Sequence, residues 1–106
     1  MIIYNITFHI ENSVLSECVD FLKSTYIPLA TQSGFMHSPC FHRILPHEEE
    51  VDGSSYAVQL KVKNIETLNY WIEKEGVVLS QLLVKKFGSK VMGFTTVLEE
   101  IALNNG

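Results

Sequence analysis

The chain has 106 residues, of which 46% are hydrophobic and 19% charged, a composition typical of one globular domain. Its formal net charge of −4 argues against nucleic acid as a partner, because binding to phosphate backbones depends on clustered Lys and Arg. No apolar run approaches the roughly 18 residues of a membrane span, and the first residues lack the basic segment of a signal peptide. We therefore expect a single cytoplasmic domain over residues 1–106, with no membrane partner.

Two cysteines, Cys18 and Cys40, are present. Disulfides are rare in reducing compartments, so both are expected to be free thiols that are buried as small apolar groups. A disulfide between them is the minor alternative.

The first expected element is a strand over residues 2–10, where large apolar residues and a second, more polar set alternate strictly. The two faces of this strand would carry Ile2, Tyr4, Ile6, Phe8 and Ile10 on one side, and Ile3, Asn5, Thr7 and His9 on the other. A helix follows from a cap at Asn12 or Ser13, with apolar residues at three-and-four spacing as far as Leu29. Pro28 predicts a kink or an early end, and Gly34 marks the latest stop.

The middle of the chain predicts a hairpin of two antiparallel strands. Residues 39–45 form the second strand, in which Pro39 is acceptable at the start or on an edge. Residues 46–55 form a turn, which Glu48, Glu49 and Glu50 keep in water. In the third strand, residues 55–62, apolar and polar positions alternate again. Its two sets are Tyr56, Val58, Leu60 and Val62, and Ala57, Gln59 and Lys61.

A second helix is expected from a cap at Asn64 to a stop at Gly88. Gly76 interrupts this helix and indicates a bend or a close helix contact. The last strand covers residues 90–101, where Gly93 indicates a bulge or a close backbone approach.

The predicted order is therefore βαββαβ, an α+β fold. Right-handed crossovers place both helices on one face of a four-stranded antiparallel sheet with the order 4-1-3-2, the ferredoxin-like arrangement. The other face, called the open face below, remains uncovered. Either phase of the last strand puts apolar side chains there, whether Met92, Phe94 and Leu98 or Val91 and Val97. We therefore expect a second copy of the chain to cover this face.

Several segments resemble a family of small, uncharacterised bacterial proteins that is defined only as a domain of unknown function. They are "MIIYNITFHIE", "YIPLATQSGF", "SYAVQLKV" and above all the closing "FGSKVMGFTTVLEEI". The resemblance covers nearly the whole chain. It implies a dimeric α+β barrel in which two open faces enclose an internal cavity, and it implies no activity.

The polar residues of the open face are the candidate site: Asn5, Thr7, His9 and Gln59, joined by Arg43 if the second strand is in phase. Three interpretations remain open. These side chains could hydrogen-bond one another or water across a subunit interface, or they could bind a small molecule. By analogy with cofactor-independent monooxygenases and muconolactone isomerases of similar fold, His9 could also act as a general base.

A second candidate cluster contains His37, Cys40, His42 and His47, whose thiolate and imidazole groups suit zinc. Their spacing matches no established zinc pattern, and no second cysteine lies nearby. The chain also lacks a CxxC pair and a glycine-rich phosphate loop. We therefore expect neither a metal nor a cofactor.

Together these features favour a homodimer that uses its open face for assembly and has a small-molecule pocket there. The alternative from another class is a structural or protein-interaction module without a ligand. An enzyme that uses His9 as its base is the weaker alternative.

Overall fold

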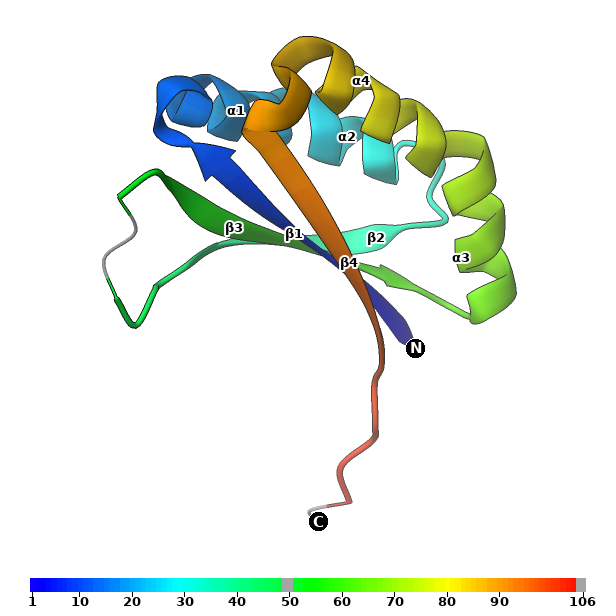
Figure 1. The fold of residues 1–106 in the computed structure, drawn as a ribbon. Helices are drawn as coiled ribbons and strands as arrows, with labels where there is room; N and C mark the ends of the chain where they lie inside the picture. Colours follow the sequence, from blue (N-terminus) through cyan, green and yellow to red (C-terminus); the bar gives the residue numbers. More distant parts are fainter. Residues whose placement is uncertain (49–50, 105–106) are drawn as a thin grey trace.

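The computed structural model describes residues 1–48 and 51–104 and shows one antiparallel sheet with all of its described helices on one side (Figure 1). The strands are β1 (Ile2–Glu11), β2 (His37–Ile44), β3 (Gly53–Val62) and β4 (Val91–Glu99). Their spatial order is β2-β3-β1-β4, which is the predicted 4-1-3-2 counted from the opposite edge. The predicted ferredoxin-like βαββαβ fold is confirmed. Within the described residues, no helix has the length and apolar character that crossing a membrane requires.

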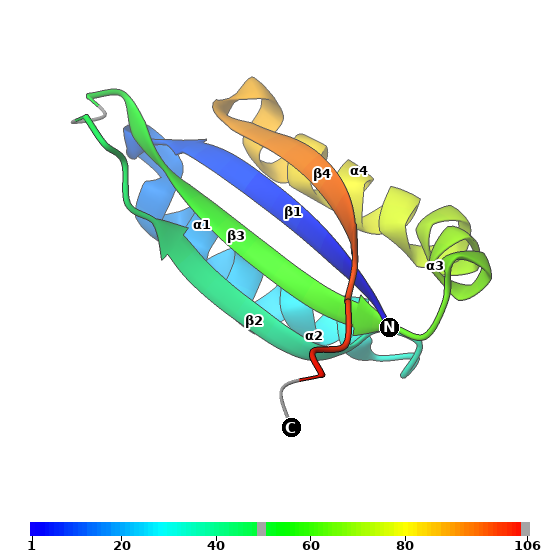
Figure 2. The same cartoon turned by 90° about the horizontal axis from the view of Figure 1, so that it is seen from below.

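Strand β1 lies at the centre of the sheet and pairs along its length with both neighbours. It runs antiparallel to β3, from the pair Ile2 and Val62 to the pair Glu11 and Gly53. On its other side it pairs with β4 from Ile2 to Ile10. Viewed from below, the four strands lie in front of the helices, so that the open face is turned toward the reader (Figure 2).

The first helical segment is continuous from Asn12 to Thr31. It contains a short turn η1 (Asn12–Val14), then α1 (Leu15–Phe21), a π-helical turn η2 (Leu22–Tyr26) and α2 (Ile27–Thr31). The predicted early end at Pro28 is wrong, because Pro28 lies in the first turn of α2 and the helix continues beyond it. The irregularity comes directly before the proline instead, where a wider turn accommodates a residue without an N–H.

The second helical segment consists of α3 (Ile65–Trp71), a second π-helical turn η3 (Ile72–Gly76), α4 (Val77–Phe87) and a last turn η4 (Gly88–Lys90). The predicted cap is confirmed, since the Asn64 side-chain oxygen accepts a hydrogen bond from the backbone N–H of Thr67 at 2.8 Å. Gly88, with φ +59°, ends α4 as predicted.

The core lies between the helices and the covered face of the sheet. Every large apolar residue that the alternation of β1 and β3 placed under the helices is buried: Ile2, Tyr4, Ile6, Phe8, Ile10, Val58, Leu60 and Val62. The two helical segments are joined by a hydrogen bond that the Trp71 indole N–H donates to the carbonyl of Ala30 at 3.0 Å. The alternation of single residues thus predicted the buried face of the sheet correctly.

Both cysteines are free thiols, as expected, but only Cys18 is buried. The predicted burial of Cys40 is wrong. Cys40 pairs with Gln59 on the open side of the sheet, in an edge strand that no helix covers there.

Two further expectations about the strands need correction. Strand β2 begins at His37, and its register with β3 shifts between His37 and Cys40, where Ser38 has φ +54°. Neither alternative predicted for Gly93 occurs: the pairing of β1 with β4 is continuous through this residue, so there is no bulge, and only side-chain atoms lie near it, at ordinary distances, so there is no close backbone approach. Residues 49–50 of the predicted turn, and with them Glu49 and Glu50, lie outside the described part of the chain.

Candidate functional site

The structure brings four of the five predicted site residues onto the open face. Cross-strand pairing sets Asn5 beside Gln59 of β3, while Thr7 and His9 follow on the same face of β1. All four are half-buried in the single chain. The predicted polar stripe therefore exists as one continuous surface.

Arg43 does not join this surface. It pairs with Tyr56, which in turn pairs with Phe8, a buried residue of the covered face. Directly paired residues in a sheet share a face, so Arg43 belongs to the helix side. The members of β2 on the open face are Cys40, His42 and Ile44.

The polar side chains of the open face contact one another. The Asn5 amide nitrogen donates to the Thr7 hydroxyl at 3.2 Å. The Nδ1 atom of His9 lies 3.1 Å from the Ser55 hydroxyl oxygen, and its Nε2 atom lies 3.7 Å from a carboxylate oxygen of Asp52. Asp52 is exposed, with 80% of its side chain accessible. The contacts of Asn5, Thr7 and His9 agree with the interpretation in which these side chains hydrogen-bond locally, whereas Gln59 has no side-chain hydrogen bond within the described residues.

Large apolar side chains surround the stripe. The phase that the sequence left open is decided, because Met92, Phe94 and Leu98 pair with His9, Thr7 and Ile3 on the open face. Their exposed fractions are 53%, 58% and 41%. This edge of the sheet is thus far more apolar than an ordinary solvated surface.

The second predicted cluster is not brought together. Across residues 1–48 and 51–104, no three side chains of the metal-binding types lie close enough to hold an ion. The Cys40 thiol lies 4.0 Å from the Ser38 carbonyl, and the His37 ring lies 2.9 Å from the Ser38 hydroxyl.

A cavity of about 160 Å³ lies on the other side of the sheet, between its covered face and α4. We call it the aromatic cavity. The sheet contributes Tyr4, Ile6, Phe8, Val91, Gly93 and Thr95, and the helices contribute Tyr26, Trp71, Gly76, Ser80, Leu83 and Val84. Thr95 and Ser80 are exposed, so they mark a mouth between β4 and α4. No sequence pattern predicted this site.

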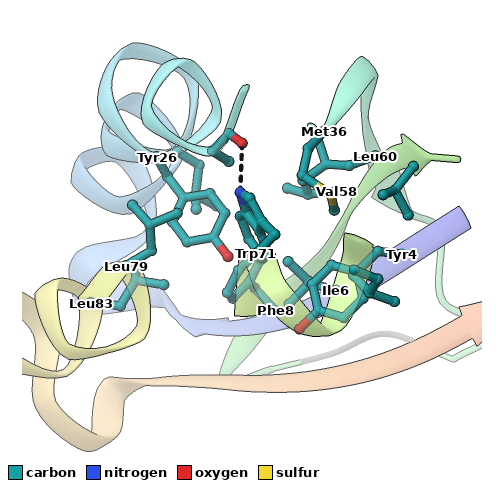
Figure 3. Packing of buried hydrophobic residues seen from close by; sticks show 14 of the residues in the cluster. Tyr4, Ile6, Phe8, Tyr26, Met36, Val58, Leu60, Trp71, Leu79 and Leu83 are labelled. Carbon is teal, nitrogen blue, oxygen red and sulfur yellow. Dashed lines mark hydrogen bonds between the residues drawn. The ribbon is translucent and has the colours of Figure 1, made fainter. Parts of the chain in front are cut away.

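Aromatic rings form much of its wall (Figure 3). The rings of Tyr4 and Trp71 meet edge to face, with centroids 5.8 Å apart. Those of Phe8 and Tyr26 do the same at 5.6 Å. Such pairs add stabilisation beyond the area that they bury.

The polar side chains of the lining are Ser80 and Thr95 at the exposed mouth and the two tyrosines in the buried part. Tyr4 is 9% exposed and Tyr26 is 5% exposed, and neither hydroxyl has a hydrogen-bond partner among the described residues. Every fully buried polar side-chain atom of the described chain has a partner, so these hydroxyls border open space. Burial raises the pKa of both tyrosines, and the neighbouring Tyr4 raises that of Tyr26 further. Both are therefore neutral hydrogen-bond donors at physiological pH.

Both π-helical turns lie at this site. Tyr26 ends η2, while Trp71 directly precedes η3 and Gly76 ends it. A Cβ atom on Gly76 would lie 3.0 Å from the Trp71 ring, so the close neighbour of this glycine is a side chain of its own helical segment rather than a second helix. Such π-helical turns are frequent at functional sites.

Gly93 also borders the cavity, and its role differs from that of Gly76. A Cβ atom there would lie at ordinary contact distances, 3.5 Å from the Phe8 ring and 3.9 Å from the Ile6 side chain. Space for a side chain exists, and the glycine leaves it empty. In the sequence, the only signals of this site are the glycines Gly76 and Gly93 and the tyrosines Tyr4 and Tyr26 at core positions. They are far apart along the chain, so no local pattern connects them.

Comparison with known proteins gives a family and a fold. The family model described as "Domain of unknown function (DUF4286)" matches residues 1–101. No curated protein matches the chain. Among solved structures, an ethyl tert-butyl ether D (EthD) family protein from Bacillus halodurans is similar with a TM-score of 0.68 and 14% identity, covering 95% of this chain and 100% of its own.

Two further solved structures share the fold. HapK from Hahella chejuensis has a TM-score of 0.69 at 9% identity and covers 100% of this chain and 98% of its own. A dimeric ferredoxin-like protein from an uncultured marine organism has a TM-score of 0.63 at 9% identity, with 96% of each chain covered. At these identities the likeness concerns the fold alone.

Proposed function

The chain belongs to the DUF4286 family, a domain of unknown function, and we propose from its geometry that it is a homodimeric binding protein for a small neutral molecule. The aromatic cavity is the binding site. The open face is the dimer interface, and its polar stripe lies between the two copies.

The observation that carries the binding role is the pair of unpartnered tyrosine hydroxyls. Buried polar groups are nearly always hydrogen-bonded, and leaving one without a partner costs about 1–3 kcal/mol. Tyr4 and Tyr26 both expose a free hydroxyl to a cavity with a mouth at the protein surface. A bound molecule or water would satisfy them, and the aromatic wall favours a molecule with apolar surface.

The dimer is supported by the chemistry of the open face. Met92 and Phe94 are both more than half exposed in the single chain, and Leu98 and Ile44 lie on the same surface. Exposed apolar patches of this kind mark interaction sites. A second copy would present the same patch, as the two-fold symmetry of homodimers requires, and one solved structure of this fold is described as dimeric.

The stripe of Asn5, Thr7, His9 and Gln59 then has a role in assembly. Side chains that already bond one another, as Asn5 and Thr7 do, enter an interface at little cost in unpaired polar groups. A ligand site between the copies and general-base catalysis by His9 both stay predictions.

The binding role is tested by filling the cavity. We expect Gly93→Val to place its side chain in the empty space beside Phe8 and to block binding. The matched control is Thr96→Val on the open face of the same strand. The probes are α-methylstyrene and acetophenone, two neutral single-ring compounds of nearly the same shape.

Trp71 makes the measurement direct, because it is the only tryptophan and lines the cavity. We expect its single indole N–H resonance to shift when either probe is added to the unmodified protein or to Thr96→Val, and to stay in place in Gly93→Val. If neither probe shifts the Trp71 resonance of the unmodified protein, the binding role is contradicted. Gly93→Val itself should fold and gain about 1 kcal/mol of stability, since it fills a void and removes a strand glycine.

The assembly is tested by sedimentation at micromolar concentration, where we expect a dimer. A monomer would favour the alternative role, in which the open face docks a different protein.

A further inference from the structure

We propose that the ligand of the aromatic cavity is a neutral compound with one aromatic ring and a carbonyl group, whose oxygen accepts hydrogen bonds from both Tyr4 and Tyr26. This inference rests on the proposed binding role and specifies its ligand class. Size, wall chemistry and polarity each restrict that class separately.

Size restricts the ligand to one ring. The cavity measures about 160 Å³. An apolar protein cavity of about 150 Å³ binds benzene, so this space accommodates a benzene-sized ring and a small substituent. Two fused rings would have to project through the mouth between α4 and β4.

The wall chemistry favours an aromatic ring. Phe8, Trp71 and the rings of both tyrosines border the space, and each belongs to an edge-to-face pair. Offset and edge-to-face contacts continue readily onto a further ring, which adds stabilisation beyond the buried area. Ile6, Leu83 and Val91 complete an apolar surface around that ring.

The polar groups select the substituent. The Trp71 indole N–H already donates a hydrogen bond to the Ala30 carbonyl. Among the buried lining residues, the remaining donors are therefore the hydroxyls of Tyr4 and Tyr26. In the view of Figure 3, Tyr26 and Tyr4 lie on either side of Trp71. A carbonyl oxygen has two lone pairs and can accept from two donors at once. In our proposal, one carbonyl group in the cavity that both residues line accepts from both tyrosines.

The absence of charge from the described lining residues excludes an ionised ligand. A carboxylate in this site would lose its hydration without meeting a Lys, Arg or His side chain. Burial raises the pKa of both tyrosines, so they stay neutral at physiological pH. A cationic ligand would therefore find no negative charge on them.

The experiment compares three probes of similar outline by titration calorimetry. Acetophenone carries the carbonyl group, α-methylstyrene has a CH₂ group in place of the oxygen, and benzoate carries a charge. With the unmodified protein we expect acetophenone to bind at least tenfold more tightly than α-methylstyrene and at least a hundredfold more tightly than benzoate. Two neutral hydrogen bonds in a site without bulk water are sufficient for the first ratio.

The tyrosine variants assign that preference to its donors. Tyr4→Phe and Tyr26→Phe each remove one hydroxyl and keep the ring, and the double variant removes both. We expect each single variant to lower the ratio of acetophenone to α-methylstyrene affinity, and the double variant to bring it below threefold. Circular dichroism verifies the fold, and the single variants suffice if the double variant does not fold.

The outcomes separate the two proposals. If α-methylstyrene binds the cavity and the affinity ratio is below ten, the carbonyl inference is overturned and the binding role stands. A ratio that survives in the tyrosine variants overturns the inference as well, because other groups then supply the preference. If neither neutral probe binds the unmodified protein, the binding role itself fails.

Discussion

The two faces of the sheet treat polar groups in opposite ways, although the same strands build both. On the open face, the side chains of Asn5 and Thr7 bond each other, and His9 bonds Ser55. On the covered face, Tyr4 and Tyr26 are more deeply buried as residues, and yet their hydroxyls have no hydrogen-bond partner among the described residues. On the face that looks like a site in the sequence, three of the four stripe residues already have hydrogen-bond partners, whereas the face that looks like an ordinary core borders the cavity in which we propose that a ligand binds.

The apolar residues show the reverse contrast. Phe8 is 3% exposed and packs among other rings, whereas Phe94, one position out of phase on the neighbouring strand, is 58% exposed. The apolar side chains of the covered face stabilise the single chain. Those of the open face gain their burial only when something covers them.

The largest expected difference follows from truncating these two phenylalanines. Phe8→Ala should lower the free energy of unfolding by about 3–5 kcal/mol, because it removes a buried ring and leaves a cavity. Phe94→Ala should lower it by less than about 1 kcal/mol in the monomer. Urea denaturation at several protein concentrations separates the free energy of unfolding of the monomer from the free energy of dimer dissociation. Equal losses in the two variants would contradict the division of roles between the faces.

A charge on the open face should break the dimer that we propose. Phe94→Asp would bury an unpaired carboxylate between two copies, and we expect the dimer dissociation constant to rise at least about a hundredfold, or about 2.7 kcal/mol. Val78→Asp is the matched control, since Val78 is 52% exposed on α4, on the other side of the molecule. Sedimentation velocity measures the dissociation constant of both variants. Dissociation by the α4 variant, with the β4 variant intact, would place the interface on the helices.

The two cysteines provide a chemical comparison of the same faces. Burial, reinforced by Glu17, raises the pKa of Cys18 from 9.0 to about 11, whereas Cys40 is exposed. A thiol-specific reagent at pH 8 should therefore modify Cys40 first and reach Cys18 only on unfolding. Cys18→Ala removes the buried thiol and Cys40→Ser the exposed one, so each variant identifies the product of the other. Rapid double labelling of the native protein would contradict the burial of Cys18.

The raised pKa of Cys18 also has a consequence for stability. At pH values well below 9 the thiol is protonated in both states, so its contribution to stability is constant. Between pH 9 and about 11 the unfolded chain releases the proton while the folded chain retains it, so the free energy of unfolding should fall as pH rises. The tyrosines Tyr4 and Tyr26, whose pKa values are raised by burial, add to this loss above pH 10. Denaturation in Cys18→Ala should show a shallower fall.

The smallest expected effect concerns the stripe itself. Ser55→Ala removes the hydroxyl that lies 3.1 Å from His9, and we expect a loss of about 0.5–1 kcal/mol. Its neighbour Ser54, for which no side-chain hydrogen bond occurs in the described chain, is the control. A loss well above 2 kcal/mol on Ser55→Ala would mean that the stripe supports the fold rather than the interface.

Strict alternation in residues 2–10 and 55–62 was enough to predict which side of these strands is buried, because a strand reverses its side chains at every residue. The cap at Asn64 and the stop at Gly88 were equally local. Arg43 and Cys40 were harder to place. The phase of β2 depends on a register shift near Ser38, which a short edge strand with Pro39 does not reveal by periodicity.

What the sequence alone determined, then, is the order of elements, the covered and open faces of the central strands, and the family. The physical reason is that periodicity and capping act over a few residues. Only the tertiary structure decided that Tyr4, Tyr26 and Trp71, which are far apart along the chain, surround a space that Gly93 leaves empty. A cavity is the volume that remains between packed elements, and its size follows from ångström-scale positions that no local pattern encodes.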